Sequence, residues 1–210
     1  MVRTHPQWLG VREVMRQGGI GTLRAVSSFF SYFNEDAANV RNVPEYGGGG
    51  LFDIGCYPIT ISRFLFGAEP LRVAGCLELD KRFGTDRLAS AVLEFAAGQS
   101  IFTCSTQAAP YQRVQVIGTR GRLEVEIPFN APPDRPCRVF LDHGRDLAGG
   151  EIETVSFETC DQYTIQGDLF SKAILDGTDV PSPIEDAVSN MACIDAIFKS
   201  ADTGRWEVPQ

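Results

Sequence analysis

A carboxylate and a phenol lie four residues apart in this chain: Asp53 and Tyr57 follow the glycine run 47–50. The apolar residues after Tyr57 recur at helical spacing, which predicts a helix over residues 51–66 that ends at Gly67. Residues four apart in a helix lie on one face, one turn from each other. Asp53 and Tyr57 would therefore be presented together, as two groups able to exchange protons with a small polar molecule.

The glycine run itself allows two interpretations. Glycines ahead of a helix let a backbone or a ligand approach the unpaired N–H groups of the first turn. A phosphate cradle is the second interpretation, but no strand precedes the run, as a phosphate loop requires. The cluster at residues 18–21 follows a helical pattern and precedes a strand, so it is typical of a helix end. The sequence therefore contains no dinucleotide-binding Gly-x-Gly-x-x-Gly motif between a strand and a helix.

The elements that must position these residues follow an α+β order. Strands are predicted at residues 22–33, 71–79, 89–95, 100–107, 112–117, 122–127, 138–141 and 151–157. Further helices are predicted at residues 6–17, 162–175 and 184–201. Short turns between consecutive strands indicate hairpins. We expect one domain over residues 1–210, α+β, with a mainly antiparallel, open-faced sheet and helices packed on one face.

Composition excludes several classes of partner. The net charge of −8 argues against binding to nucleic acid or to an anionic membrane, because both attract basic surfaces. No apolar run approaches the roughly 20 residues that span a bilayer, and residues 1–6 do not resemble a signal peptide, so we expect a cytoplasmic protein. The six cysteines are widely spaced and there are two histidines, so we expect reduced thiols and no metal site.

The motif around Asp53 and Tyr57 resembles a family signature. Gly-Gly-Gly-x-Leu-x-Asp-x-Gly-x-Tyr-Pro is similar to that of the Gfo/Idh/MocA oxidoreductases, in the branch of dihydrodiol and xylose dehydrogenases, which have Tyr where inositol dehydrogenases have His. The resemblance covers almost the whole chain. Its other parts are Arg3-Thr4-His5-Pro6-Gln7, Gly118-Thr119-Arg120-Gly121, Asp195-Ala196-Ile197-Phe198-Lys199-Ser200-Ala201 and Gly204-Arg205-Trp206.

This resemblance implies a function. It corresponds to the C-terminal substrate-binding and oligomerisation domain of an NAD(P)-dependent oxidoreductase acting on a sugar, polyol or dihydrodiol. The family's N-terminal Rossmann domain carries a Gly-rich loop and a Glu-Lys-Pro motif, and neither is found in this sequence. We therefore expect that NAD or NADP is bound mainly by a domain absent from residues 1–210. The alternative is a truncated, non-catalytic module for dimerisation or small-molecule binding.

The same resemblance assigns roles at the motif. Tyr57 matches the family's acid/base, whose phenol pKa must be drawn toward neutrality by a nearby cation; the family uses the lysine of Glu-Lys-Pro. Asp53 would bind substrate hydroxyls or orient Tyr57, or would only stabilise a helix N-terminus. Arg41, in the polar loop 34–46, would face the nicotinamide or the substrate, or would be solvated.

Three further residues match positions near the family's substrate cleft. Arg3 and His5 match the start of the domain, and Tyr163 matches an aromatic residue at a helix start. A structural role explains His5 and Tyr163 as well. The resemblance also implies a homo-oligomer formed through the open sheet face. Apolar positions for that face would be Val114, Val116, Leu123, Val125 and Ile127, unless these residues fill the domain's own core.

Overall fold

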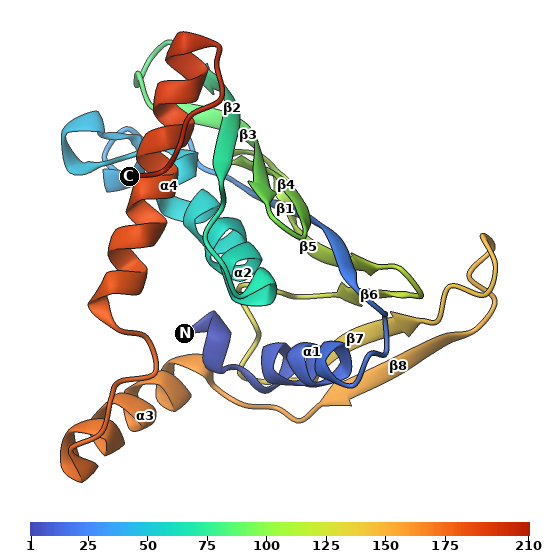
Figure 1. Cartoon of the computed structure of the whole chain (residues 1–210). Coiled ribbons are helices and arrows are strands. Elements are labelled where there is room, and N and C mark those ends of the chain that lie inside the picture. The colour runs from blue at the N-terminus through green and yellow to red at the C-terminus, as the bar shows by residue number, and fades with distance from the viewer. The chain divides into compact units, whose positions relative to one another are not determined.

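The computed structural model describes residues 1–210 and has an α+β fold. Its eight strands are hydrogen-bonded in the order β2-β3-β4-β1-β5-β6-β7-β8 and are mostly antiparallel (Figure 1). The strands are β1 (Leu23–Phe33), β2 (Arg72–Leu79), β3 (Asp86–Phe95), β4 (Gly98–Ser105), β5 (Gln107–Gly118), β6 (Arg122–Val125), β7 (Cys137–Asp142) and β8 (Ile152–Phe157). The helices are α1 (Pro6–Arg16), α2 (Cys56–Phe66), α3 (Gln162–Asp176) and α4 (Ile184–Thr203). The predicted fold class is confirmed.

The chain divides into two compact units. The first unit comprises residues 1–24 and 113–187, and the second unit comprises residues 25–112 and 188–210. Each unit has its own buried core, and the proposed catalytic motif belongs to the second unit.

The second unit has its helices on one face of its strands. Val73 pairs with Leu93 and Leu93 with Ser100, so these three residues share a face, and all three are fully buried. On this face α2 contacts β4 through the hydroxyls of Ser62 and Ser100, 2.6 Å apart. The C-terminal part of α4 contacts β2, where the N–H of Gly75 donates to Ser200 Oγ at 3.0 Å.

One strand pairing differs from the predicted hairpins. β1 runs parallel to β4, with Ser27 opposite Ile101 and Ser31 opposite Ser105. Parallel strands need a long connection, and here α2, β2 and β3 lie between them in the sequence. A pairing between distant segments leaves no local signal, which explains why the sequence did not predict it.

The first unit is an antiparallel group of strands covered by α1. The indole Nε1 of Trp8 on α1 donates to the carbonyl of Pro128 at 2.9 Å, and Gln7 Nε2 donates to the carbonyl of Ile127 at 2.9 Å. Gly10 allows Phe157 of β8 to approach, because a Cβ there would lie 2.6 Å from the Phe157 ring.

Four of the five apolar residues proposed either for an open dimer face or for the domain's own core belong to this core. The buried ones, with no exposed area, are Val114, Val116, Leu123 and Val125. The alternative interpretation of these residues, that they fill the domain's own core, is therefore correct for these four. None of the helices in residues 1–210 combines the length and apolarity that a bilayer-spanning segment needs.

Candidate functional site

The helix that carries Asp53 and Tyr57 begins with a π-helical turn. Residues Leu51–Gly55 form this turn, α2 continues from Cys56, and Gly67 ends it in the left-handed conformation at φ 62°. Pro58, which has no N–H to donate, follows the π turn within this continuous helix. The predicted helix over residues 51–66 is thus confirmed, with a wider first turn than an α-helix has. Single π turns are frequent at functional sites.

Asp53 is held between a phenol and a guanidinium. The Tyr32 hydroxyl donates to Asp53 Oδ2 at 2.5 Å, and Arg41 Nε donates to Asp53 Oδ1 at 2.8 Å. Tyr32 comes from β1, and Arg41 comes from a short 3-10 turn, Val40–Asn42, in the predicted polar loop. Asn39 caps this turn, its side chain accepting from the N–H of Arg41 at 3.1 Å. Strand, loop and helix therefore each contribute one residue to this cluster.

The Asp53 carboxylate keeps its two neighbours protonated. The Asp53 carboxylate raises the pKa of Arg41, which keeps the guanidinium charged. Burial and the same carboxylate raise the pKa of Tyr32, so its hydroxyl remains a proton-bearing donor. Arg41 uses Nε for Asp53 and is nearly half exposed, at 46% of its side chain. Its two terminal NH₂ groups can therefore donate to a ligand.

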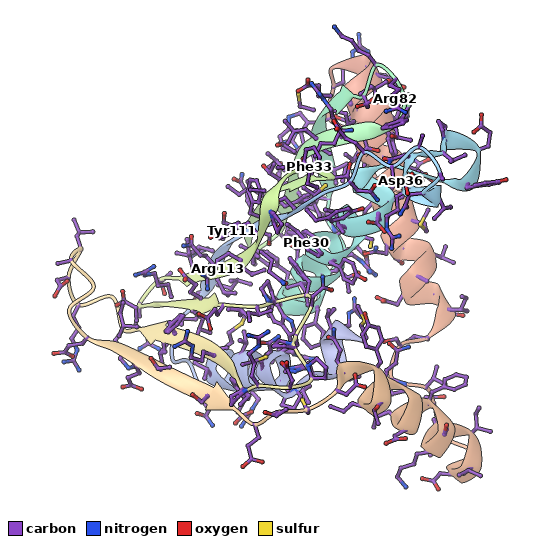
Figure 2. The ribbon with its side chains drawn as sticks, turned by 180° about the vertical axis from the view of Figure 1, so that it is seen from behind. Phe30, Phe33, Asp36, Arg82, Tyr111 and Arg113 are labelled. Atoms are coloured by element: carbon purple, nitrogen blue, oxygen red, sulfur yellow. The ribbon has the colours of Figure 1, made fainter.

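Tyr57 lies in the same unit, on the helix that carries Asp53. Its ring contacts Phe30 of β1 edge to face, with centroids 5.9 Å apart and planes at 61°. Phe30 faces the α2 side of β1, as Figure 2 shows. Arg41 also interacts electrostatically with Tyr57 and with Tyr32. A phenol that neighbours a guanidinium is a candidate for proton transfer, because a cation favours the phenolate form.

Asn190 of α4 fixes the start of α2 beside Tyr57. Its Nδ2 donates to the carbonyl of Cys56 at 3.2 Å, and its Oδ1 accepts from the Thr60 hydroxyl at 3.0 Å. Cys56 itself is not a nucleophile, since burial and Asp53 raise the pKa of its thiol to about 12.

The glycine run surrounds a carboxylate of the protein itself. Asp86, the first residue of β3, accepts from the N–H of Leu51 at 2.6 Å through Oδ2. A Cβ on Gly49 would lie 2.0 Å from Asp86 Oδ1, and Gly49 has φ 123°, so only glycine fits there. The place that a cradled phosphate would take is therefore filled, and the structure does not support the phosphate interpretation of this run. The residues of this turn do not fit a dinucleotide phosphate.

The remaining predicted residues belong to the first unit. Arg3 pairs with Asp186 at 2.8 Å. Tyr163 is 62% exposed near the start of α3, whose N-cap is Asp161. The structure thus brings Tyr57, Asp53 and Arg41 together in one unit and places Arg3, His5 and Tyr163 in the other.

His5 has the contacts of a structural residue. It is 1% exposed and caps α1, with Nδ1 accepting from the N–H of Gln7 at 3.2 Å. Nε2 lies 3.3 Å from Cys160 Sγ. Burial lowers the pKa of His5, so the ring is neutral near pH 7 and carries its proton on Nε2. No group of three or more His, Cys, Asp or Glu side chains in residues 1–210 is arranged to hold a metal ion.

Sequence reasoning missed Tyr32 and Asp86. The signal that could have placed Tyr32 is the two-residue period of the predicted strand 22–33, which puts it on the same face as Val26, Ser28 and Phe30, the face that is buried in the structure. That alternation points Tyr32 to the helix side. Asp86 had no such signal, since it contacts Leu51 across 35 residues of sequence.

Comparison with known proteins agrees with this architecture. Residues 8–124 match the profile of the GFO/IDH/MocA C-terminal domain. An uncharacterized oxidoreductase of Rhizobium meliloti is 41% identical over 208 residues, which is 99% of this chain and 62% of that protein. A D-xylose 1-dehydrogenase (NADP(+)) of Haloferax volcanii is 33% identical over 208 residues, 97% of this chain and 61% of that protein.

Solved structures share the fold. KijD10, a 3-ketoreductase from Actinomadura kijaniata, superimposes with a TM-score of 0.86 at 23% identity, over 95% of this chain and 60% of that one. An aldose–aldose oxidoreductase from Caulobacter crescentus gives 0.85 at 23% identity, over 99% and 62%. The chain spans about three-fifths of the length of the curated relatives it matches. It belongs to the Gfo/Idh/MocA oxidoreductase family and corresponds to that family's C-terminal domain.

Proposed function

We propose that this chain is the substrate-binding and oligomerisation domain of a nicotinamide-dependent oxidoreductase, and that Tyr57 is its acid/base. The substrate would be a sugar, a polyol or a dihydrodiol. The observation that carries this proposal is the cluster in which Arg41 binds Asp53 at 2.8 Å and interacts with Tyr57. The names of relatives support the substrate class: D-xylose 1-dehydrogenase in Haloferax volcanii and trans-1,2-dihydrobenzene-1,2-diol dehydrogenase in Mus musculus.

The residues of the cluster would divide the work. As the substrate is oxidised, the proton of its hydroxyl group passes to the Tyr57 phenolate, while a hydride leaves the carbon that carries this hydroxyl. Arg41 favours the phenolate by its charge, and its terminal NH₂ groups donate to the substrate's oxygen. Asp53 holds the guanidinium in place and can accept from a neighbouring substrate hydroxyl. Tyr32, by donating to Asp53, fixes the carboxylate.

Residues 1–210 would act as a single domain together with a dinucleotide-binding domain that is not in this sequence. A nicotinamide coenzyme bound there would accept the hydride. Two features support this division: Asp86 fills the glycine run, and α3 exposes large apolar residues, with Ile174 at 64% and Leu175 at 85%. Exposed apolar patches are typical of surfaces that another domain or protein covers.

Calorimetry tests directly whether the coenzyme is bound outside residues 1–210. Titration of the chain with NADH and with NADPH is expected to show no binding by either. Tight binding of one of them would contradict the proposal that the coenzyme site lies outside residues 1–210.

A second copy of the chain would pack on the open face of the second unit. This face, opposite α2 and α4, carries Phe29, Phe33, Leu88, Ile101 and Tyr111. Phe33 is 60% and Ile101 49% exposed, and Phe33 and Tyr111 are labelled in Figure 2. Alternating strand residues place this set away from the helices. A sheet face that exposes several large apolar side chains favours a homo-oligomer.

Turnover by an assembled enzyme tests the proposed chemistry. The chain is joined to the part of the Rhizobium meliloti relative that it does not match, and coenzyme binding by the fusion is verified first. We expect nicotinamide-dependent oxidation of at least one member of a panel of aldoses, polyols and trans-dihydrodiols. Coenzyme and substrate binding without turnover would favour the alternative of a non-catalytic binding module.

A further inference from the structure

Asp86 is a buried carboxylate that the proposed proton transfer does not use. Asp86 is 2% exposed, and its carboxylate accepts hydrogen bonds from backbone N–H groups rather than from a cation. Burial of a carboxylate without a cationic partner is costly. Accordingly, burial raises the pKa of Asp86 to about 6, against the opposing effect of the N–H groups of Leu51 and Gly50. Such a group weakens the fold near neutral pH, which points to a role at the turn it contacts.

The contacted turn lacks a cap of its own. The first N–H groups of a helix have no partner within it, and Gly50, at the N-cap position before the π turn, has no side chain to provide one. Asp86 reaches from β3 and accepts from the N–H of Leu51 at 2.6 Å. Its negative charge also complements the positive end of the helix dipole. The cap of this helix therefore comes from a different element, 35 residues away in the sequence.

The position of the site residues depends on this turn. The N–H of Asp53 donates to the carbonyl of Gly49 at 3.1 Å, so Asp53 is bonded to the same backbone that covers Asp86. We propose that Asp86 is a positioning residue of this site: its carboxylate anchors the Gly50–Leu51 backbone and thereby fixes Asp53 and Tyr57 against Tyr32 and Arg41. The anchoring is independent of the activity, whereas its catalytic meaning rests on the proposed function.

Asp86, with its pKa of about 6, is surrounded by groups from several elements. On β4, Cys104 interacts electrostatically with Asp86, and burial raises the pKa of its thiol well above the usual range. Asp53 of the π turn and Cys56 of α2 also interact electrostatically with Cys104. The thiol of Cys56 stays protonated near neutral pH, because burial raises its pKa to about 12. On β3, Arg87 pairs with Glu78. A change in the turn between about pH 5 and pH 7 would therefore report on Asp86.

Nuclear magnetic resonance of the wild-type chain provides the first test. The amide signals of Gly50 and Leu51 are expected to titrate with an apparent pKa near that of Asp86, and the signals of Asp53 and Tyr57 are expected to follow the same curve. This measurement needs no variant and no substrate. Titration of Leu51 without any response at Asp53 and Tyr57 would overturn the positioning role.

Three variants separate positioning from general stability. Asp86→Asn keeps the shape but loses the charge and one acceptor, and Asp86→Ala loses both acceptors. Asp80→Asn is the matched control, because Asp80 also accepts backbone N–H groups in this unit, from Arg82 and Phe83. Hydrogen exchange at Leu51 is expected to accelerate at least about tenfold in Asp86→Ala, less in Asp86→Asn, and not in Asp80→Asn.

Amide hydrogen exchange in strands β3 and β4 distinguishes a local effect at the turn from global destabilisation. Leu93 and Phe102 are expected to keep their protection in Asp86→Asn, and the pH response at Asp53 and Tyr57 is expected to vanish. Equal acceleration at Leu51, Leu93 and Phe102 would contradict the proposal, since it would show only global destabilisation. None of these readouts requires coenzyme or substrate, so an inactive enzyme with a normal Asp86 response would count against the proposed function alone.

Discussion

The hydroxyl of Tyr32 donates a hydrogen bond to the carboxylate of Asp53 at 2.5 Å. The two residues come from a strand and from the π turn that begins the next helix, 21 residues apart in the sequence. Because Arg41 holds the other carboxylate oxygen, Asp53 is fixed on both sides. The first prediction concerns this bond.

Tyr32→Phe removes the donor and keeps the ring. A hydrogen bond to a charged group contributes about 1.5–3 kcal/mol, so we expect the assembled enzyme to lose about tenfold in kcat/KM. The free energy of unfolding should fall by about 1.5–3 kcal/mol. Steady-state kinetics and chemical denaturation measure the two effects. Unchanged kinetics with reduced stability would show that Tyr32 is only structural.

Arg41→Gln removes the cation beside Tyr57. We expect kcat to fall at least about tenfold and the alkaline rise of the pH–rate profile to move to higher pH, because the phenolate loses its stabilising charge. Arg41→Lys should restore part of both. Stability should change by less than about 1 kcal/mol, since the Arg41 pair is partly exposed. Arg138→Gln, which breaks a comparably exposed pair with Glu126, is the control and should leave the profile unchanged.

Asp86 should make stability depend on pH in an unusual direction for a carboxylate. Its pKa is about 6 in the folded chain, above the ordinary value of 3.8. Between about pH 4 and pH 6 the folded state therefore binds more protons than the unfolded state, so the free energy of unfolding falls as pH rises. The loss is about 3 kcal/mol at full extent.

Urea denaturation of wild type and Asp86→Asn across this range measures the difference. Other carboxylates titrate in both proteins, so the difference between the two curves isolates Asp86. A constant difference from about pH 4 to pH 7 would show that Asp86 does not titrate there.

Ile101→Lys should disrupt the proposed oligomer. A lysine at this position on the open face would be desolvated in a homodimer. We expect the dissociation constant to rise at least about tenfold in sedimentation equilibrium, which corresponds to about 1.4 kcal/mol. Leu147→Lys, in an exposed loop, is the control and should have no effect. A wild-type chain that remains monomeric at all concentrations would contradict the proposed oligomer.

Local patterns predicted most of the elements of this fold. The glycines after α1, α2 and α3, together with apolar periodicity, located those helices, and turn residues located the hairpins. The strand order and the parallel β1–β4 pair were not predictable, because they depend on contacts between distant segments. The π turn was also missed, since periodicity does not distinguish it from a first α-helical turn.

The site shows the same division. Asp53 and Tyr57 were predicted from one motif, and Arg41 was predicted from the family resemblance of the loop before it; all three occur in one unit of the structure. The apolar alternation over residues 112–127 identified buried positions but could not tell a domain core from an interface. The glycine run was recognised in the sequence, but the residue that requires glycine there, Asp86, lies in a distant strand and was not predicted.

The most direct test of the proposed function is the pre-steady-state oxidation rate of the assembled enzyme with Tyr57→Phe. The variant keeps the ring that packs on Phe30 and removes only the hydroxyl. We expect the hydride-transfer rate to fall by about 10²–10⁴-fold, with coenzyme affinity unchanged. Tyr46→Phe, at an exposed tyrosine, should match wild type. A Tyr57→Phe enzyme that transfers hydride within a few fold of wild type would contradict the assignment of Tyr57 as the acid/base.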